Sequence, residues 1–113
     1  MMNGYNKDEA LAFIVKRIPE KDHKELAGMI AELVSLAIDA DMEFMHKSGV
    51  LDEEGNAGDE YYEDDDAFEY MVEYIVAKKN LTPEQAVKVA SLVDDYMDQQ
   101  QAYLEEKGLC DWE

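Results

Sequence analysis

The sequence predicts an all-α fold, namely a four-helix bundle or closely related array built from two tandemly duplicated helical hairpins with pseudo-two-fold symmetry. The first observation is an internal repeat, in which residues 10–18 return as residues 67–75 and residues 25–54 return as residues 84–113. A match of this length indicates a tandem duplication. The second observation is that apolar residues recur with helical spacing, whereas no stretch alternates with the period of two that a strand requires.

The repeat also sets the expected organisation of the chain. Its 113 residues are enough for one domain with one core, so we expect a single domain over residues 1–113. Repeat 1 covers about residues 6–54 and repeat 2 about residues 63–113, with an acidic linker over residues 52–66. One hairpin cannot cover its own apolar face, so we expect the two copies to pack face to face.

The first hairpin begins with a short helix, which is predicted over about residues 7–18. Asn6 can cap this helix, because an asparagine side chain accepts a hydrogen bond from a backbone N–H of the first turn. Pro19 disfavours helical geometry at the residue before it and therefore ends the segment.

The long helix of the first hairpin is predicted over about residues 23–48. Its apolar residues share one face, and Gly49 supplies the left-handed residue that ends it. His23 stands at the predicted start of this helix, where we expect its side chain to be solvated.

The second hairpin repeats this scheme, with a short helix predicted over about residues 65–79 and a long helix that runs from Pro83 to Lys107 and stops at Gly108. The segment 82–85, of sequence TPEQ, is the clearest start signal in the chain. Its threonine can cap the helix, its proline takes the first turn where no N–H is needed, and its glutamine completes a capping box.

The charge of the chain excludes several classes of ligand. The net charge is −18 at pH 7. Direct binding to nucleic acid is not expected, since it requires cations that replace condensed counterions. An anionic membrane surface is excluded on the same ground, and no apolar run approaches the roughly 18 residues that span a bilayer. Cys110 is the only cysteine, which fits a reducing, cytoplasmic setting.

Two polar residues fall on the apolar faces of the long helices. Asp41 lies among the core positions of the first copy, and Gln100 is its counterpart in the second copy. They form an interior polar pair that either lines a small polar pocket at the pseudo-axis or hydrogen-bonds internally and fixes the register. We expect the second arrangement, because buried polar groups without partners are costly.

A group of aromatic residues lies off the main apolar stripe of the short helices. Phe13 and Arg17 belong to the first copy, and Tyr70 and Tyr74 are their counterparts in the second. The helical spacing leaves two interpretations open. These residues form either a second packing face between the hairpins or the surface of a homodimer made through Phe13, Tyr70 and Tyr74.

The acidic linker resembles the calcium-binding loop of EF-hand proteins over its twelve residues from 52 to 63. Oxygen-bearing side chains occupy ligand positions of that loop: Asp52, Glu54, Asn56, Glu60 and Glu63. However, Ala57 stands where the sharp turn needs glycine, and Asp59 stands where an apolar residue normally packs. We therefore expect a solvated acidic loop, keep those five side chains only as candidate cation ligands, and assign no metal or cofactor to the chain.

Two other groups of side chains could act as metal ligands by type, but their positions do not match those of known metal sites. Glu43 and His46 form the E-x-x-H string of di-iron bundles, but the second copy has no histidine to complete such a site. Three aspartates resemble the carboxylate clusters of all-α metal-dependent nucleotide pyrophosphohydrolases, but they are predicted to point away from the core: Asp94, Asp95 and Asp98.

These patterns predict a non-enzymatic, cytoplasmic, acidic helical interaction module that binds a basic surface on another protein. We expect the partner to contact the linker and its aromatic residues: Asp52, Glu53, Glu54, Asp59, Glu60, Tyr61, Tyr62 and Glu63. Aromatic side chains of this kind are enriched at protein interfaces. One alternative is an inhibitor that imitates nucleic-acid charge. Another is a divalent-cation-binding protein or a metal-dependent all-α enzyme.

Overall fold

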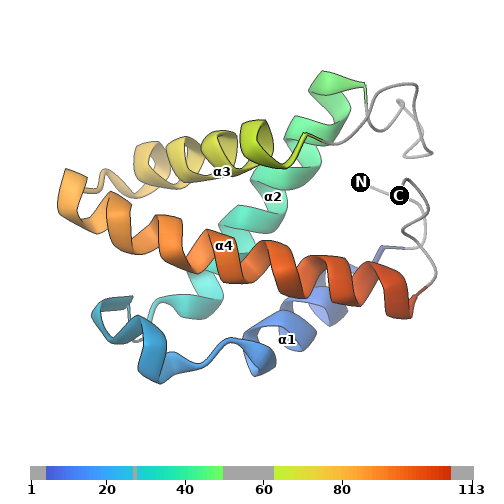
Figure 1. Cartoon of the computed structure of the whole chain (residues 1–113), viewed down its shortest axis with the longest axis horizontal. Coiled ribbons are helices and arrows are strands. Elements are labelled where there is room, and N and C mark those ends of the chain that lie inside the picture. The colour runs from blue at the N-terminus through green and yellow to red at the C-terminus, as the bar shows by residue number, and fades with distance from the viewer. Residues whose placement is uncertain (1–4, 27, 50–62, 108–113) are drawn as a thin grey trace.

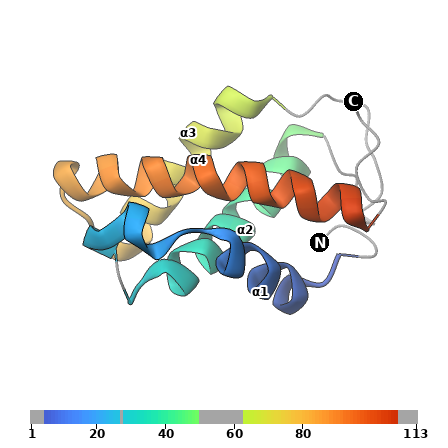
Figure 2. The same ribbon diagram turned by 60° about the horizontal axis from the view of Figure 1, so that its bottom comes forward.

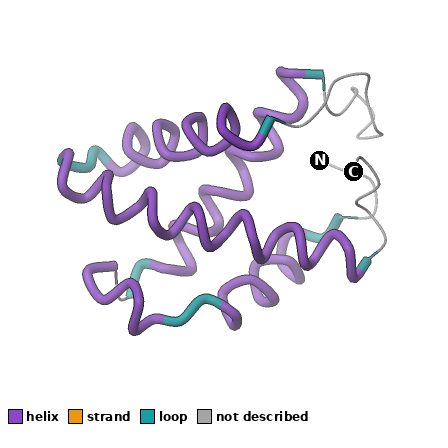
Figure 3. Tube along the Cα trace, in the orientation of Figure 1, coloured by secondary structure: helices purple, strands orange, loops and turns teal. Residues whose placement is uncertain are grey.

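The computed structural model describes residues 5–26, 28–49 and 63–107, and helices account for most of them (Figure 3). No strand occurs in these ranges. The helices pack against one another around a shared apolar core. The predicted all-α helical bundle is therefore confirmed.

Helix α1 (Lys7–Arg17) begins and ends close to where the sequence predicts. The Asn6 side chain accepts a hydrogen bond from the backbone N–H of Glu9 at 3.0 Å, which confirms the predicted cap. At the other end, Ile18 is extended, with φ −90° and ψ 117°. This is the conformation that the following Pro19 favours.

Helix α2 (Ile30–Ser48) starts later than predicted, so the prediction of one helix from residue 23 is wrong. The preceding segment Glu20–Leu26 forms a separate short 3-10 element, η1, which is interrupted at His23. Between the two lies Gly28, whose φ of 84° is left-handed and incompatible with a continuous helix. The C-terminal end is as predicted, since Gly49 adopts the left-handed conformation with φ 85°.

The second hairpin consists of α3 (Asp64–Lys79) and α4 (Pro83–Glu106). Asn80 ends α3 in a left-handed conformation with φ 53°. The Thr82 side chain accepts from the backbone N–H of Gln85, and the Gln85 side chain accepts in return from the N–H of Thr82. The predicted capping box at the start of α4 is therefore confirmed. Gly108, the predicted stop, lies outside the described residues.

The helices form an array in which α4 is central (Figure 1). Helix α3 runs beside α4 as the other arm of a hairpin, α1 lies on the opposite side of α4, and α2 crosses behind it. A view turned by 60° shows the same arrangement, with α2 crossing behind α4 (Figure 2). Each short helix contacts both long helices, and the long helices contact each other.

The two copies bury equivalent positions of the repeat. In the short helices the buried pairs are Ala10 with Ala67, Ile14 with Met71, and Ile18 with Ile75. In the long helices they include Leu33 with Leu92, Val34 with Val93, and Met45 with Leu104. A rotation near 180° between the hairpins stays a prediction.

The aromatic residues off the main stripe pack between the copies. The Phe13 ring of α1 lies 5.4 Å from the Tyr103 ring of α4, and the Tyr70 ring of α3 lies 5.6 Å from the Phe44 ring of α2. These are equivalent contacts, because Tyr70 is the repeat counterpart of Phe13 and Tyr103 that of Phe44. Tyr74 in turn stacks on Tyr70, with 6.5 Å between ring centroids. Dimerisation through Phe13, Tyr70 and Tyr74 stays a prediction.

Candidate functional site

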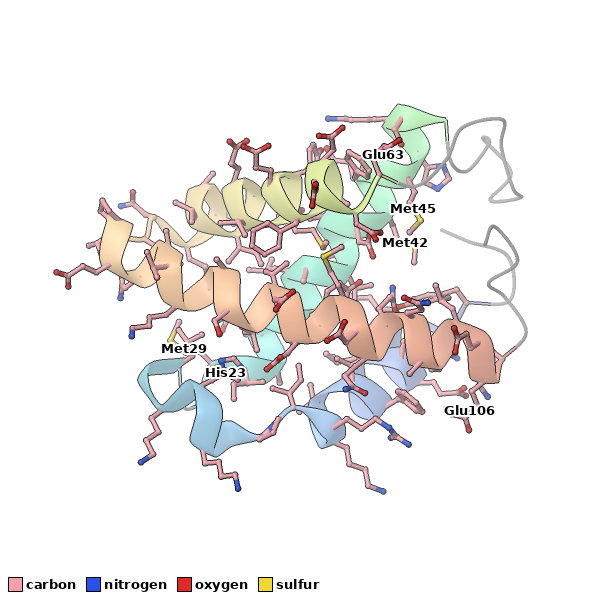
Figure 4. The ribbon with its side chains drawn as sticks, viewed as in Figure 1. His23, Met29, Met42, Met45, Glu63 and Glu106 are labelled. Carbon is pink, nitrogen blue, oxygen red and sulfur yellow. The ribbon has the colours of Figure 1, made fainter. Side chains whose placement is uncertain are left out.

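The predicted partner segment falls mostly beyond what the structure describes. The outside positions comprise both partner-binding candidates and candidate cation ligands: Asp52, Glu53, Glu54, Asn56, Asp59, Glu60, Tyr61 and Tyr62. The described remainder of the acidic linker is the stretch 63–66. Glu63 is exposed and immediately precedes α3 (Figure 4).

Charge is distributed unevenly along α3. Its first turn carries three exposed carboxylates, Asp64–Asp66, and exposed Glu69 and Glu73 follow on the same helix. None of these five makes an ion pair with a described residue. At the other end, Lys79 pairs with Glu32 of α2, and the Lys78 ammonium lies 5.3 Å from the centroid of the Tyr74 ring. Negative charge in the first turn is favoured by the helix dipole, so α3 tolerates this acidic half.

A surface groove of about 420 Å³ lies between α3 and α4, beside this acidic half. We call it the α3–α4 groove. Its lining residues come from both helices: Asp65 and Phe68 from α3, and Ala90, Ser91 and Asp94 from α4. The small side chains on α4 leave room next to the Phe68 ring. The groove therefore combines an apolar wall with two carboxylates that approach it from different helices.

The three aspartates of α4 take two different roles. Asp94 and Asp98 are exposed, as predicted, but Asp95 faces η1. Its Oδ2 lies 2.6 Å from Nε2 of His23, whose side chain is only 3% exposed (Figure 4). The prediction of a solvated His23 is wrong, because the left-handed turn at Gly28 separates η1 from α2 and lets η1 pack against α4.

Glu43, the acid of the E-x-x-H string in α2, is held by contacts within the fold. Glu43 accepts a hydrogen bond from the Tyr70 hydroxyl at 2.6 Å and pairs with Lys47 at 2.8 Å. The Lys47 hydrogen bond, with that of Tyr70, lowers the pKa of Glu43, and the same pairing raises the pKa of Lys47 to about 12. Among the side chains that the structure describes, which exclude those of residues 20, 22 and 25, no three His, Cys, Asp or Glu gather so that they could hold a metal ion.

A matching cluster ties α1 to α4. Glu9 accepts a hydrogen bond from the Tyr103 hydroxyl at 3.2 Å and pairs with Lys107 at 2.5 Å. The Lys107 hydrogen bond, with that of Tyr103, lowers the pKa of Glu9. Sequence reasoning missed both Tyr–Glu–Lys clusters. Only the spacing of Glu43 and Lys47, four residues apart on one helix, offered a signal.

The interior polar residues lie in the core and bind tyrosine hydroxyls. Asp41 is 2% exposed and Gln100 is 4% exposed. The Tyr96 hydroxyl donates to Asp41 Oδ2 at 2.9 Å, and the Tyr5 hydroxyl donates to Gln100 Oε1 at 2.8 Å. Burial raises the pKa of Tyr5 above its usual range, so this hydroxyl stays protonated. The buried Gln100 Nε2 has no hydrogen-bond partner in the described structure.

Sequence reasoning missed Tyr5 as a core residue. It precedes α1, outside any helical pattern, yet its ring packs edge-on against Tyr103 with 5.4 Å between centroids. Its partner Gln100 is 95 residues away in the sequence. The interior network consists of hydrogen bonds that fix side-chain positions, and it contains no recognisable nucleophile and base.

The remaining findings concern membranes and known proteins. None of the described helices is long and apolar enough to cross a membrane. Comparison with protein-family models, with curated proteins and with solved structures finds no match to this chain. The geometry of the acidic surface is therefore the basis on which a function is proposed.

Proposed function

We propose that this chain is a non-enzymatic interaction module whose acidic surface binds a basic surface on another protein in a reducing, cytoplasmic setting. The observation that carries the proposal is the acidic half of α3, where Asp64–Asp66, Glu69 and Glu73 are exposed and make no ion pair with any described residue. A cluster of carboxylates makes the local electrostatic potential more negative and steers a cationic partner toward it.

The distribution of the basic side chains supports this proposal. The chain has ten Lys and Arg residues, all within the described ranges. Lys7, Lys47, Lys79 and Lys107 pair with carboxylates elsewhere in the fold, at Asp39, Glu43, Glu32 and Glu9 respectively. Lys47 also donates to the Tyr70 hydroxyl of α3, but none of these four lysines makes an ion pair with the acidic half of α3. The sequence immediately before α3 adds further acidic residues, and residues 48–77 contain no Lys or Arg.

The test is capture of partners from a lysate of the native source with the immobilised full chain. One variant neutralises five linker residues as Asn or Gln: Asp52, Glu53, Glu54, Asp59 and Glu60. A matched control changes the net charge by the same amount at exposed positions elsewhere: Asp8, Glu84, Asp98, Glu105 and Glu106. A second variant neutralises exposed carboxylates of the acidic half of α3: Asp64, Asp66, Glu69 and Glu73. We expect the linker variant to lose the partner, the α3 variant to bind it more weakly, and the control to keep it.

Salt and competitors make the outcome specific. Binding between exposed charges weakens as the Debye length falls from about 10 Å at 0.1 M salt to about 3 Å at 1 M. Capture that resists salt, or that the linker variant retains, contradicts the proposal. Displacement of the partner by double-stranded DNA would indicate a nucleic-acid-binding partner and thus the inhibitor alternative. A thermal melt that rises with Ca²⁺, Mg²⁺ or Mn²⁺ at constant ionic strength would indicate the cation-binding alternative.

A further inference from the structure

The α3–α4 groove continues into an exposed apolar position on α4. Val87 is 68% exposed, and it is the only large hydrophobic side chain this exposed among the described residues. It precedes Ala90, Ser91 and Asp94 by three, four and seven positions, so all four lie along one stripe of the helix. Two turns of helix separate Val87 from Asp94, which is about 10.5 Å. The apolar side chain of Val87 and the carboxylate of Asp94 are thus held at a fixed spacing along α4.

The two carboxylates of the groove are exposed and come from different helices. Asp65 and Asp94 make no ion pair with any residue that the structure describes. A cation placed between the two helices could therefore contact both carboxylates.

The apolar wall selects the kind of cation. A guanidinium group is planar, donates to two carboxylates at once and stacks on an aromatic ring, whereas an ammonium is a compact, strongly hydrated charge. The chain itself shows this contact, since the Arg17 guanidinium lies 3.7 Å from the centroid of the Phe13 ring. In the groove, the Phe68 ring offers the same surface beside Asp65 and Asp94.

We propose that the α3–α4 groove binds an arginine side chain of a partner protein, stacked on Phe68 between Asp65 and Asp94, while a small apolar side chain of the same segment covers Val87. This inference rests on the proposed function and names its anchor. In an extended segment three residues span about 10 Å, which matches the distance from Val87 to Asp94. The recognised segment therefore has an apolar residue three positions from its arginine, and the probe below takes the order in which the apolar residue comes first.

The probe is the acetylated, amidated tetrapeptide valine–glycine–glycine–arginine, titrated into the ¹⁵N-labelled full chain at low salt. The matched control peptide carries citrulline, which keeps the shape of arginine but has no charge. We expect amide shifts centred on Phe68, Ala90 and Ser91 and extending to Val87. We expect the citrulline peptide to bind about fivefold more weakly or worse, since it lacks the charge-assisted hydrogen bonds.

Two matched variants localise the binding. Asp65→Asn and Asp94→Asn should each weaken the arginine peptide severalfold, whereas Asp66→Asn, in the same turn of α3 but outside the groove, should not. Equal affinity of the two peptides, or an equal effect of Asp66→Asn, overturns the inference. If Asp65→Asn and Asp94→Asn together leave lysate capture intact while the linker variant abolishes it, the arginine anchor is wrong and the proposed function stands. Loss of capture in the linker variant and in the Asp65→Asn/Asp94→Asn variant supports both the proposed function and the arginine anchor.

Discussion

The hydrogen bond between Tyr5 and Gln100 provides a quantitative test of the interior network. The Tyr5→Phe change keeps the ring that packs on Tyr103 but removes the donor that Gln100 Oε1 uses at 2.8 Å. Gln100 Nε2 already lacks a hydrogen-bond partner, so this variant also removes the hydrogen bond of the other polar atom of the buried amide, Oε1. A buried acceptor without a donor costs about 1–3 kcal/mol, so we expect a loss of about 1–2 kcal/mol in the free energy of unfolding.

The complementary change gives a similar loss for a different reason. Gln100→Met removes the unpartnered amide nitrogen, which is favourable, but leaves the buried Tyr5 hydroxyl without its acceptor. The double variant Tyr5→Phe/Gln100→Met removes both polar groups, and such replacements are often nearly neutral. We therefore expect the double variant to lie within about 0.5 kcal/mol of the wild type, so the magnitude of the coupling energy is about 2–4 kcal/mol, the sum of the two single losses.

Urea denaturation followed by far-UV circular dichroism measures these differences, provided that the m-values stay equal. Tyr70→Phe is the matched control, because it removes a hydroxyl from the half-exposed bond to Glu43. That variant should lose less than about 1 kcal/mol. If the two core substitutions instead add to within about 0.3 kcal/mol in the double variant, the hydrogen bond contributes nothing specific and the reasoning is refuted.

Three further predictions follow from local features of the fold. Gly28→Ala should lower the melting temperature, because φ at this position is 84° and alanine is strained there, although no atom lies within 4 Å of the added Cβ. An unchanged melting temperature would contradict this argument. Asp95→Ala should destabilise the fold by about 1–3 kcal/mol in urea, since buried His23 loses its partner, whereas a neutral effect would show that the 2.6 Å contact is dispensable. The pKa values of Glu9 and Glu43 in the folded state lie below the ordinary value of 4.5, so their contribution to stability is present above pH 4.5 and is lost as the pH falls through the folded values. The difference in free energy of unfolding between the wild type and Glu9→Gln/Glu43→Gln should therefore shrink on acidification, and a difference that is constant with pH would contradict this.

Local signals in the sequence predicted the helix ends well, because caps are decided within one turn. The Asn6 cap and the Thr82–Gln85 capping box involve residues three apart, and both formed as expected. The start of α2 could not be read in the same way. The apolar pattern runs through Gly28, and whether a glycine there stays helical or turns left-handed depends on the packing of η1 against α4.

The candidate site depended on contacts that no local pattern encodes. Tyr5 meets Gln100 across 95 residues of sequence, and His23 meets Asp95 across 72. The α3–α4 groove arises because Phe68 stands opposite Ala90 and Ser91 once the hairpin has closed. Burial of Asp41 and Gln100 was predictable, since both fall on apolar helix faces, but their tyrosine partners were not.

The crosswise aromatic packing has a consequence for how the two halves of the chain assemble. Phe13 of one copy lies against Tyr103 of the other, and Tyr70 lies against Phe44 in return. Each half therefore covers an aromatic side chain of the other. Because both halves belong to one polypeptide, their encounter takes place within a molecule, at an effective concentration that the connecting segment sets. The same holds for the pair of Lys79 with Glu32, which also joins the two halves.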